Sequence, residues 1–318
     1  MKLDYLKGHM GGNLILLLDG RQIPEDRRVI LDTALEALGP LRLWGHQAGI
    51  LFPSPKPGHV KALIADITNR DYIPACGGFT QVAGMAFATT GWAERFGLGT
   101  AGTGGTVILE TESGETRLEI QQTPEGTFRT GSDLVGFAGL LREIGTKPVD
   151  LDGIQAFQSG MYLVLDAEKV RKKHPDADFE TMNSKARDAL VGLQRTFHRV
   201  TGSGSLHFSL YDDRSSDSGH LRALFPHSIT TGHVEPACGT GSVALALALL
   251  LSGEGKSRGL AGGKGIDVIL ETGGEPVLGG PDTTRVTIET DGDDILRAVF
   301  SHSLVEITSE GTVFLENS

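Results

Sequence analysis

Apolar and polar residues follow two different periods along this chain. The segment "GNLILLLDG" (residues 12–20) is a short apolar run closed by turn residues, which predicts a buried strand. The segment "RVILDTALEALG" (residues 28–39) has helical spacing and predicts a short amphipathic helix that ends at a glycine. The segment "TVILETESGETRLEIQQTPEGTFRTG" predicts a β-meander with turns near Gly114 and Gly126. The first half therefore combines strands and helices.

The second half repeats this order of elements. The segment "AFQSGMYLVLD" predicts a strand, residues 179–200 predict a polar helix, and "SLHFSLYDD" predicts another strand. Further strands follow in "GIDVILETGG", "TRVTIETDGD" and the final 25 or so residues. We expect an α+β protein of two similar domains. The first holds residues 1–130 and returning strands at about 296–318, and the second holds residues 131–295.

The two cysteines of the chain stand in matching contexts, one in each half. The first lies in "PACGGFTQVAG", which begins at Pro74, and the second in "PACGTGSVALA", which begins at Pro236. The residues after each cysteine are apolar on nearly all sides, so each predicts a helix buried inside its own domain. We expect these helices to end at Gly91 and Gly253.

This arrangement suits proton transfer beside a carboxylate. A helix N-terminus offers unpaired N–H groups and a partial positive charge, which hold an anion and lower the pKa of a thiol. If two such ends meet one substrate, the thiolate of one cysteine removes a proton and the thiol of the other returns one. The alternative is a pair of buried structural cysteines, since free cysteine is among the most buried residue types. The repeated P-A-C-G context favours the catalytic interpretation for Cys76 and Cys238.

Composition and charge exclude several other classes. The chain has 318 residues and a formal net charge of −11, which argues against an electrostatic nucleic-acid binder. The longest apolar run, "VALALALLL", is too short for a membrane span and predicts a core helix. Two cysteines without a recognisable signal peptide favour the cytoplasm. The ten histidines form no H-x-x-x-H pair and there is no C-x-x-C, so no zinc site is expected.

Further motifs make the chain resemble the diaminopimelate epimerase and proline racemase superfamily. The opening "KGHMGGNLILLLD" is similar to the family pattern K-x-H-x-x-G-N, "ITNRDYIPACGG" supplies the first cysteine segment, and "ACGTG" is the family's second. The resemblance implies two pseudo-symmetric domains, each a curved sheet or barrel around a central buried helix, and isomerisation without metal, flavin or pyridoxal phosphate. It also implies catalysis by Cys76 and Cys238 and substrate binding by Asn13, Asn69, Gly77, Gly78, Gly239 and Thr240.

The departures from the family pattern concern the substrate. Ile229 and Thr230 stand where the epimerases carry Glu-Arg, and Gly160 in "SGMY" replaces another substrate asparagine. We therefore expect a small carboxylate other than diaminopimelate. An allylic isomerase of an unsaturated di- or tricarboxylate, a non-catalytic carboxylate-binding protein and a thiol redox sensor remain as alternatives. No nucleic-acid or membrane partner is expected, and a homodimer stays open.

Overall fold

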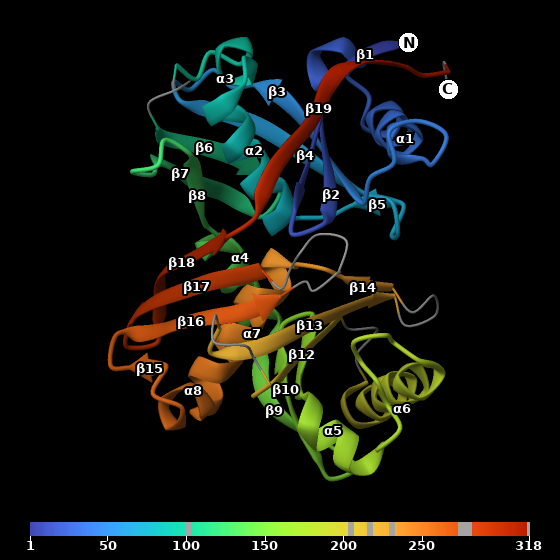
Figure 1. Ribbon diagram of the computed structural model, residues 1–318, viewed down its shortest axis with the longest axis vertical. Helices are drawn as coiled ribbons and strands as arrows, with labels where there is room; N and C mark the ends of the chain where they lie inside the picture. The colour runs from blue at the N-terminus through green and yellow to red at the C-terminus, as the bar shows by residue number, and fades with distance from the viewer. Residues whose placement is uncertain (100–103, 203–206, 215–218, 229–232, 273–281, 317–318) are drawn as a thin grey trace. The chain divides into compact units, whose positions relative to one another are not determined.

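The computed structural model describes residues 1–99, 104–202, 207–214, 219–228, 233–272 and 282–316. The chain divides into two compact units, each with its own sheet and core (Figure 1). Unit 1 consists of Met1–Gly136 and Ser301–Ser318, and unit 2 consists of Phe137–Phe300. The first unit is therefore discontinuous in sequence. Among the described residues, no helix has both the length and the apolar character that a membrane crossing requires.

Unit 1 is a mixed sheet to which a late segment of the chain adds a strand. Its strands pair in the order β19–β1–β2–β3–β4–β6–β7–β8, and the β2–β3 and β4–β6 pairs are parallel. Parallel neighbours need a crossover connection, which α1 and α2 supply. The elements are β1 (Lys2–Met10), β2 (Asn13–Asp19), η1 (Gly20–Gln22), α1 (Arg27–Leu38), β3 (Gln47–Pro53), β4 (His59–Asp66), β5 (Asp71–Tyr72), α2 (Gly77–Thr89), α3 (Trp92–Arg95), β6 (Gly105–Thr111), β7 (Gly114–Gln122), β8 (Phe128–Asp133) and β19 (Val305–Phe314).

Strand β2 is buried on both faces, which explains its uninterrupted apolar run. Ile15 and Leu17 belong to the core around α2, whereas Leu16 and Leu18 belong to the core beneath α1. Side chains of a strand alternate between its two faces, so one strand can serve both cores. The helix α1 predicted from residues 28–39 is confirmed, with Asp26 as its N-cap and Gly39 as its C-cap.

Helix α2 lies inside the sheet of unit 1, while α1 covers the outside (Figure 1). It contacts β1, β2, β3, β7, β8 and β19, and Phe79, Val82 and Phe87 on it are fully buried. The fit is close because Gly49 on β3 leaves room for the Phe79 ring: a Cβ on Gly49 would lie 2.0 Å from Phe79 Cε2. A helix surrounded by a sheet has no polar face, as its sequence predicts.

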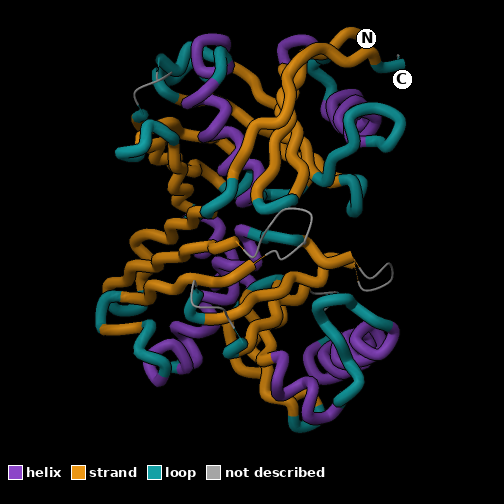
Figure 2. The backbone as a smooth tube through the Cα atoms, viewed as in Figure 1, coloured by secondary structure: helices purple, strands orange, loops and turns teal. Residues whose placement is uncertain are grey.

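Unit 2 repeats the topology of unit 1. Its strands pair in the order β9–β10–β11–β12–β13–β16–β17, again with two parallel pairs, β11–β12 and β13–β16. Helix α7 occupies the inside and α6 the outside (Figures 1 and 2). The elements are α4 (Val135–Ile144), β9 (Thr146–Leu151), β10 (Ile154–Ser159), β11 (Tyr162–Asp166), α5 (Ala167–Lys173), α6 (Ser184–Thr201), β12 (His207–Asp212), β13 (Leu221–Ser228), β14 (His233–Glu235), α7 (Gly239–Ser252), α8 (Glu254–Ser257), β15 (Ala261–Gly262), β16 (Gly265–Thr272), β17 (Asp282–Asp291) and β18 (Asp294–His302).

Three sequence-based boundaries differ from the structure. The segment "AFQSGMYLVLD" is a hairpin, β10 and β11, because Gly160 takes a left-handed φ of 58° in the turn. The polar helix starts at Ser184, where the Asn183 side chain caps it. Helix α2 ends at Thr89 with Thr90 as its C-cap, so Gly91 instead precedes α3. By contrast, α7 does end at Gly253, which adopts the left-handed conformation.

Candidate active site

Cys76 is the N-cap of the buried helix α2. Its backbone is extended, with φ −150° and ψ 114°, and its sulfur accepts a hydrogen bond from the backbone N–H of Phe79 at 3.4 Å. The residue is 7% exposed and is a free cysteine. A thiol in this place takes the role that a serine or aspartate oxygen usually has at a helix start.

Cys238 is the N-cap of α7 and has the same local geometry. Its φ and ψ are −129° and 109°, and its sulfur accepts a hydrogen bond from the N–H of Gly241 at 3.4 Å. Cys238 is also a free thiol and is partly exposed. The expectation that each cysteine immediately precedes a buried helix is confirmed.

The first turn of each helix presents backbone N–H groups that the helix itself does not use. The first intrahelical bonds run from Thr80 N–H to the Cys76 carbonyl and from Ser242 N–H to the Cys238 carbonyl. The thiols take the N–H groups of Phe79 and Gly241. The predicted anion donors stand before these positions, where no i−4 carbonyl exists within the helix. They are Gly77 and Gly78 of α2 and Gly239 and Thr240 of α7.

The two predicted asparagines differ in their surroundings. Asn13 begins β2 and is 1% exposed, and its Oδ1 lies 2.9 Å from His46 Nδ1. It also lies close to the start of α2, because a Cβ on Gly78 would be 3.4 Å from Asn13 Nδ2. Asn69 lies on the turn after β4, is exposed, and donates its N–H to Asp66 at 2.7 Å. The structure thus places Asn13 against the helix that Cys76 caps, whereas the described contact of Asn69 is with Asp66 on its own turn.

Two hydroxyl groups, those of Tyr162 and Thr240, form a chain that reaches Cys238 and that was not predicted from the sequence. The Tyr162 hydroxyl lies 2.7 Å from Thr240 Oγ1, which lies 3.5 Å from the Cys238 sulfur. Tyr162 begins β11 and is 7% exposed, and its ring packs against His207 and edge-on against Phe137. The missed signal is the turn before Tyr162, which mirrors the turn before Asn13.

The electrostatic environment of Cys238 overturns one expectation. Although the Cys238 residue keeps part of its surface exposed, desolvation raises the pKa of its thiol well above the ordinary value, and the Glu235 carboxylate, which accepts a hydrogen bond from the thiol, raises it further. The hydrogen bonds from Thr240 and Gly241 lower the thiol pKa, but by less than burial and Glu235 raise it. The prediction that a helix N-terminus lowers the thiol pKa is therefore wrong for Cys238, because desolvation and a nearby carboxylate outweigh the helix. Burial also raises the pKa of Tyr162 well above its ordinary value.

A second polar group is buried near α2. The side chain of Gln81, 0% exposed, donates a hydrogen bond to Ser132 at 2.7 Å and accepts one from the backbone N–H of His302. Burial lowers the pKa of His302 to about 4, although a hydrogen bond between its Nδ1 and the Leu304 carbonyl acts in the opposite direction, so this imidazole is neutral near neutral pH. The His9 side chain is also buried: the residue is 8% exposed, and its Nε2 lies 3.3 Å from a carboxylate oxygen of Glu306. The side chain of His233, like residues 229 and 230, lies outside the described parts.

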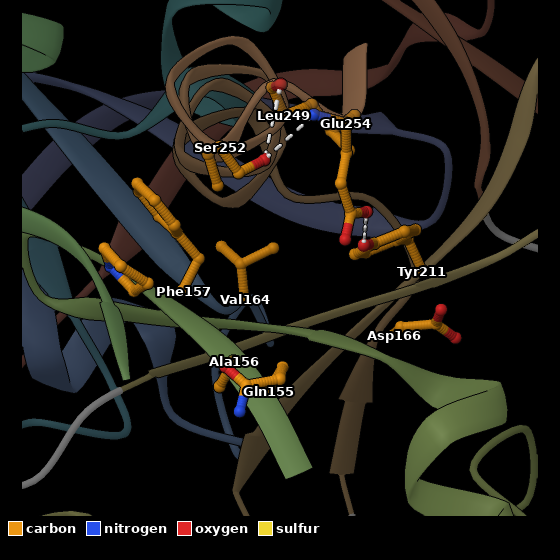
Figure 3. A pocket seen from close by; sticks show the side chains of 11 residues that line it. Gln155, Ala156, Phe157, Val164, Asp166, Tyr211, Leu249, Ser252 and Glu254 are labelled. Carbon is orange, nitrogen blue, oxygen red and sulfur yellow. Dashed lines mark hydrogen bonds between the residues drawn. The ribbon is translucent and has the colours of Figure 1, made fainter. Parts of the chain in front are cut away.

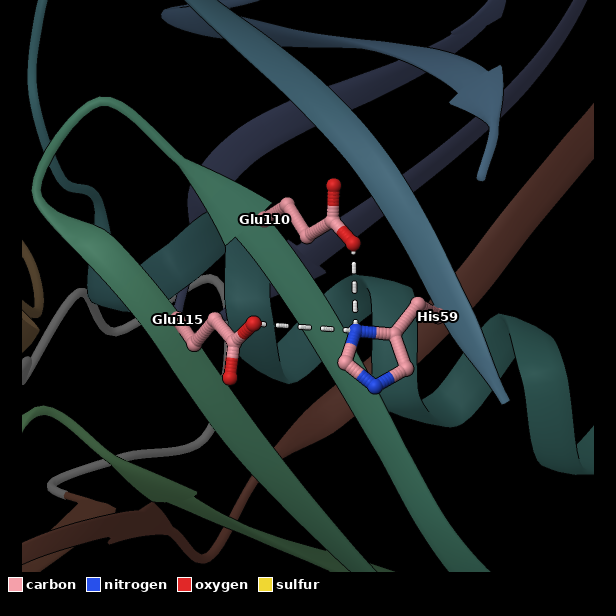
Figure 4. A group of neighbouring side chains, drawn as sticks. All are labelled: His59, Glu110 and Glu115. Atoms are coloured by element: carbon pink, nitrogen blue, oxygen red, sulfur yellow. Dashed lines mark ion pairs between the residues drawn. The ribbon is translucent and has the colours of Figure 1, made fainter. Parts of the chain in front are cut away.

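One group of side chains in unit 1 has the residue types and spacing that could bind a metal ion, but a lysine ammonium already lies beside it. The ligand atoms of His59, Glu110 and Glu115 lie within 4.8 Å of one another (Figure 4). The Lys56 ammonium, however, lies 3.6 Å from Glu110 and 2.8 Å from Glu115. A metal would have to displace this ammonium, so the group acts as an ion-pair network between β4, β6 and β7.

A small pocket of unit 2 lies at the far end of α7 (Figure 3). Its volume is about 170 Å³, and Leu249 and Ser252 of α7, Phe157 and Val164 of the hairpin and Glu254 contribute to its lining. Ser252 is 14 residues from Cys238, which at 1.5 Å per helical residue is roughly 20 Å. The pocket is therefore separate from the thiol.

Comparison with known proteins gives a match in structure alone. No protein-family model and no curated protein sequence matches the chain. A solved hydroxyproline epimerase from Agrobacterium vitis, with bound trans-4-OH-L-proline, superposes with a TM-score of 0.64 at 14% identity, over 99% of this chain and 92% of that chain. A methylitaconate-delta-isomerase has a TM-score of 0.62 at 14% identity, over 98% and 95% of the two chains.

A Bacillus anthracis phenazine biosynthesis protein of the PhzF family has a TM-score of 0.60 at 11% identity, over 99% of this chain and 100% of that chain. The chain has the proline racemase and PhzF fold. The resemblance seen in the sequence is thereby confirmed for the fold, including its two-domain α+β architecture. Within the proline racemase and PhzF fold, this chain carries a cysteine at the start of each central helix.

Proposed function

We propose that this chain is a cofactor-independent isomerase in which Cys76 and Cys238 transfer protons at a carbon next to a carboxylate. The observation that carries the proposal is the shared position of the two thiols, each the N-cap of a buried helix in its own unit. A structural cysteine has no need of this position, whereas an acid or base acting beside an anion benefits from the unpaired N–H groups there. The fold agrees with this function, since solved structures that share it include a hydroxyproline epimerase, a probable proline racemase and a methylitaconate-delta-isomerase.

In the proposed reaction, one sulfur takes the proton from the substrate carbon and the opposite sulfur delivers its own. The C–H bond breaks, its electron pair moves toward the carboxylate, and a new C–H bond forms from the other face as the second S–H bond breaks. The donors of the substrate carboxylate would be Gly77, Gly78, Gly239 and Thr240. These N–H groups would also stabilise the charge that develops on the carboxylate oxygens.

The substrate class is a small carboxylate. Asn13 is placed against Gly78 and is the better supported of the two proposed asparagine contacts, since Asn69 is exposed on its turn. The sequence lacks the Glu-Arg pair that epimerases of diaminopimelate use, so a substrate with fewer charges than diaminopimelate is proposed. The hydroxyproline bound by the Agrobacterium vitis epimerase is a compound of this size and charge.

A second candidate is an allylic isomerase of an unsaturated di- or tricarboxylate. The similarity to a methylitaconate-delta-isomerase supports it, with a TM-score close to that of the hydroxyproline epimerase. The two reactions share the first step, removal of a proton next to a carboxylate. They differ in where the proton returns: to the same carbon in a racemase, and in an allylic isomerase to the far carbon of the original double bond, so that the double bond moves by one position.

Proton exchange in deuterated water tests both. The protein is incubated with amino acids, hydroxyproline-like acids and unsaturated dicarboxylates, and the products are followed by proton NMR, chiral chromatography and ultraviolet absorbance. A racemase gives an inverted stereocentre labelled with deuterium, whereas an allylic isomerase gives a moved double bond. A compound that binds without any exchange would instead identify a non-catalytic carboxylate-binding protein and contradict the proposal.

A further inference from the structure

The hairpins of the two units place Asn13 and Tyr162 at equivalent positions. In unit 1, Met10 pairs with Asn13 across a turn of two residues, and in unit 2 Ser159 pairs with Tyr162 in the same way. Each is the first residue of the strand that next pairs in parallel, β2 with β3 and β11 with β12. Each also lies next to the second residue of the central helix, Gly78 for Asn13 and Thr240 for Tyr162.

The consequence at the two thiols is different. Gly78 has no side chain at the helix position that Thr240 occupies in unit 2. In unit 2 the Thr240 hydroxyl fills the corresponding space and lies 2.7 Å from the Tyr162 hydroxyl and 3.5 Å from the Cys238 sulfur. When Tyr162 donates to Thr240, the Thr240 hydrogen is directed at the sulfur, where it stabilises a thiolate.

Glu235 acts on Cys238 from the other direction. It ends β14, three residues before the cysteine, and is 8% exposed. Its carboxylate accepts a hydrogen bond from the thiol and repels a thiolate, so it favours the protonated sulfur. Two titratable groups of the described residues lie beside this sulfur: Glu235, which acts on its proton directly, and Tyr162, which reaches it through Thr240.

We infer that Glu235 and Tyr162 are positioning residues that set the proton affinity of Cys238 in opposite senses, so that Cys238 holds its proton in the resting protein and acts first as the acid. This rests on the proposed function for the meaning of the proton transfer. Cys238 would give its proton to the substrate carbon and keep the electron pair as a thiolate, which the Thr240 hydroxyl and the Gly241 N–H then stabilise. The resting protein would accordingly process first the enantiomer whose proton faces Cys76.

The test measures the alkylation of each cysteine by iodoacetamide in the full chain from pH 6 to 10, with peptide mass spectrometry. Only the thiolate reacts, so a change in thiol pKa is read from the midpoint of each pH profile or, where the midpoint lies above pH 10, from the rate at a fixed lower pH, and the plateau, where it is reached, reports access. Glu235→Gln should lower the Cys238 midpoint and raise its rate at pH 8 by about tenfold, the change for one pKa unit. Tyr162→Phe and Thr240→Val should raise the midpoint and slow the reaction by about two- to tenfold, and Thr240→Ser should restore it.

Cys76 in the same molecules is the internal reference, and its midpoint should stay unchanged in all four variants. An unchanged or raised Cys238 midpoint in Glu235→Gln overturns the inference, as does an unchanged midpoint in both Tyr162→Phe and Thr240→Val. These outcomes are independent of turnover. A protein without isomerase activity that still shows the opposed shifts would contradict the proposed function alone, and an active isomerase with fixed midpoints would contradict this inference alone.

Discussion

Cys76 and Cys238 accept equivalent hydrogen bonds in their two helices: each sulfur lies 3.4 Å from the backbone nitrogen of the residue three positions later. Their backbone angles agree within about 20° in φ and 5° in ψ. Each sulfur is thus held alike within its own unit, as the proposed exchange of acid and base roles requires. The differences between them then come from their neighbours.

Replacement of either cysteine by serine should separate catalysis from stability. Serine is a good N-cap, so Cys76→Ser and Cys238→Ser should change the free energy of unfolding by no more than about 1 kcal/mol. Turnover of any substrate found in the exchange screen should fall by about 100-fold or more, since a serine hydroxyl is a poor base. Urea unfolding and the deuterium-exchange rate measure the two effects. Full turnover in either variant would exclude the two-thiol mechanism.

Mild oxidation should join Cys76 and Cys238 in a disulfide. The proposed mechanism requires both sulfurs to reach one carbon, and thiols that approach this closely can form the bond when their Cα atoms come within about 7 Å. Loss of free thiols, a cross-linked peptide in mass spectrometry and recovery of activity with dithiothreitol are the expected results. The variant Cys76→Ser serves as the control for intermolecular cross-links. Two thiols that never cross-link in the presence of a bound carboxylate would count against the mechanism.

Gly49→Ala should destabilise unit 1. The new Cβ would lie 2.0 Å from Phe79 Cε2, and Phe79 is fully buried three residues after Cys76, so the first turn of α2 must move. Overpacking of this kind costs about 1–3 kcal/mol. The matched control is Gly192→Ala on the exposed face of α6, where a Cβ has nothing within 4 Å and should stabilise the helix by about 0.5–1 kcal/mol. Equal stability of the two variants in thermal unfolding would contradict the packing described for α2.

His302 should make stability depend on pH between about 4 and 6.5. Its pKa in the folded protein is lowered to about 4 by burial, whereas an unfolded histidine titrates near 6.5. In this window the unfolded chain binds a proton that the folded chain does not. The contribution of His302 to the free energy of unfolding is therefore fully present above pH 6.5, and it falls by about 3 kcal/mol as the pH is lowered to 4.

The variant His302→Gln should flatten this dependence while it lowers stability at neutral pH. Guanidinium unfolding at half-unit pH steps measures both. The aspartates whose pKa lies below the ordinary value, such as Asp4 with its hydrogen bond from Thr312, act at lower pH and do not mask the effect. A slope that persists unchanged in the variant would show that another group titrates in this range.

The sequence predicted the cysteine-capped helices well because their signals are local. A cysteine followed by glycine and an all-apolar segment specifies a helix start and a buried helix, and both α2 and α7 begin at the predicted glycine. The break within "AFQSGMYLVLD" was missed because strand propensity on both sides conceals a single glycine turn. The prediction that a glycine ends the helix was correct for Gly253, which adopts a positive φ, and wrong for Gly91, whose φ is negative.

The environment of Cys238 could not be predicted from the sequence. Tyr162 and Thr240 are 78 residues apart, and their contact depends on the parallel and antiparallel pairings that bring β11 to the start of α7. Glu235 is near Cys238 in sequence, but its effect on the thiol follows from its burial, which no spacing reveals. Helix position alone predicted a lowered thiol pKa, and the desolvation that reverses it is a property of the packed unit.

The pairing of β19 with β1 has a consequence for the order in which the chain is made. Strand β1 pairs along its whole length with residues 305–314, and these are translated only after all of unit 2. At 5–20 residues per second, strand β1 stays without its partner for roughly 10 to 30 seconds while unit 2 is synthesised. The residues of unit 2 are continuous in sequence, so this unit does not wait for a later segment of the chain. During translation the second unit can therefore mature before the first, and the early edge strand must be shielded from other nascent chains until its late partner arrives.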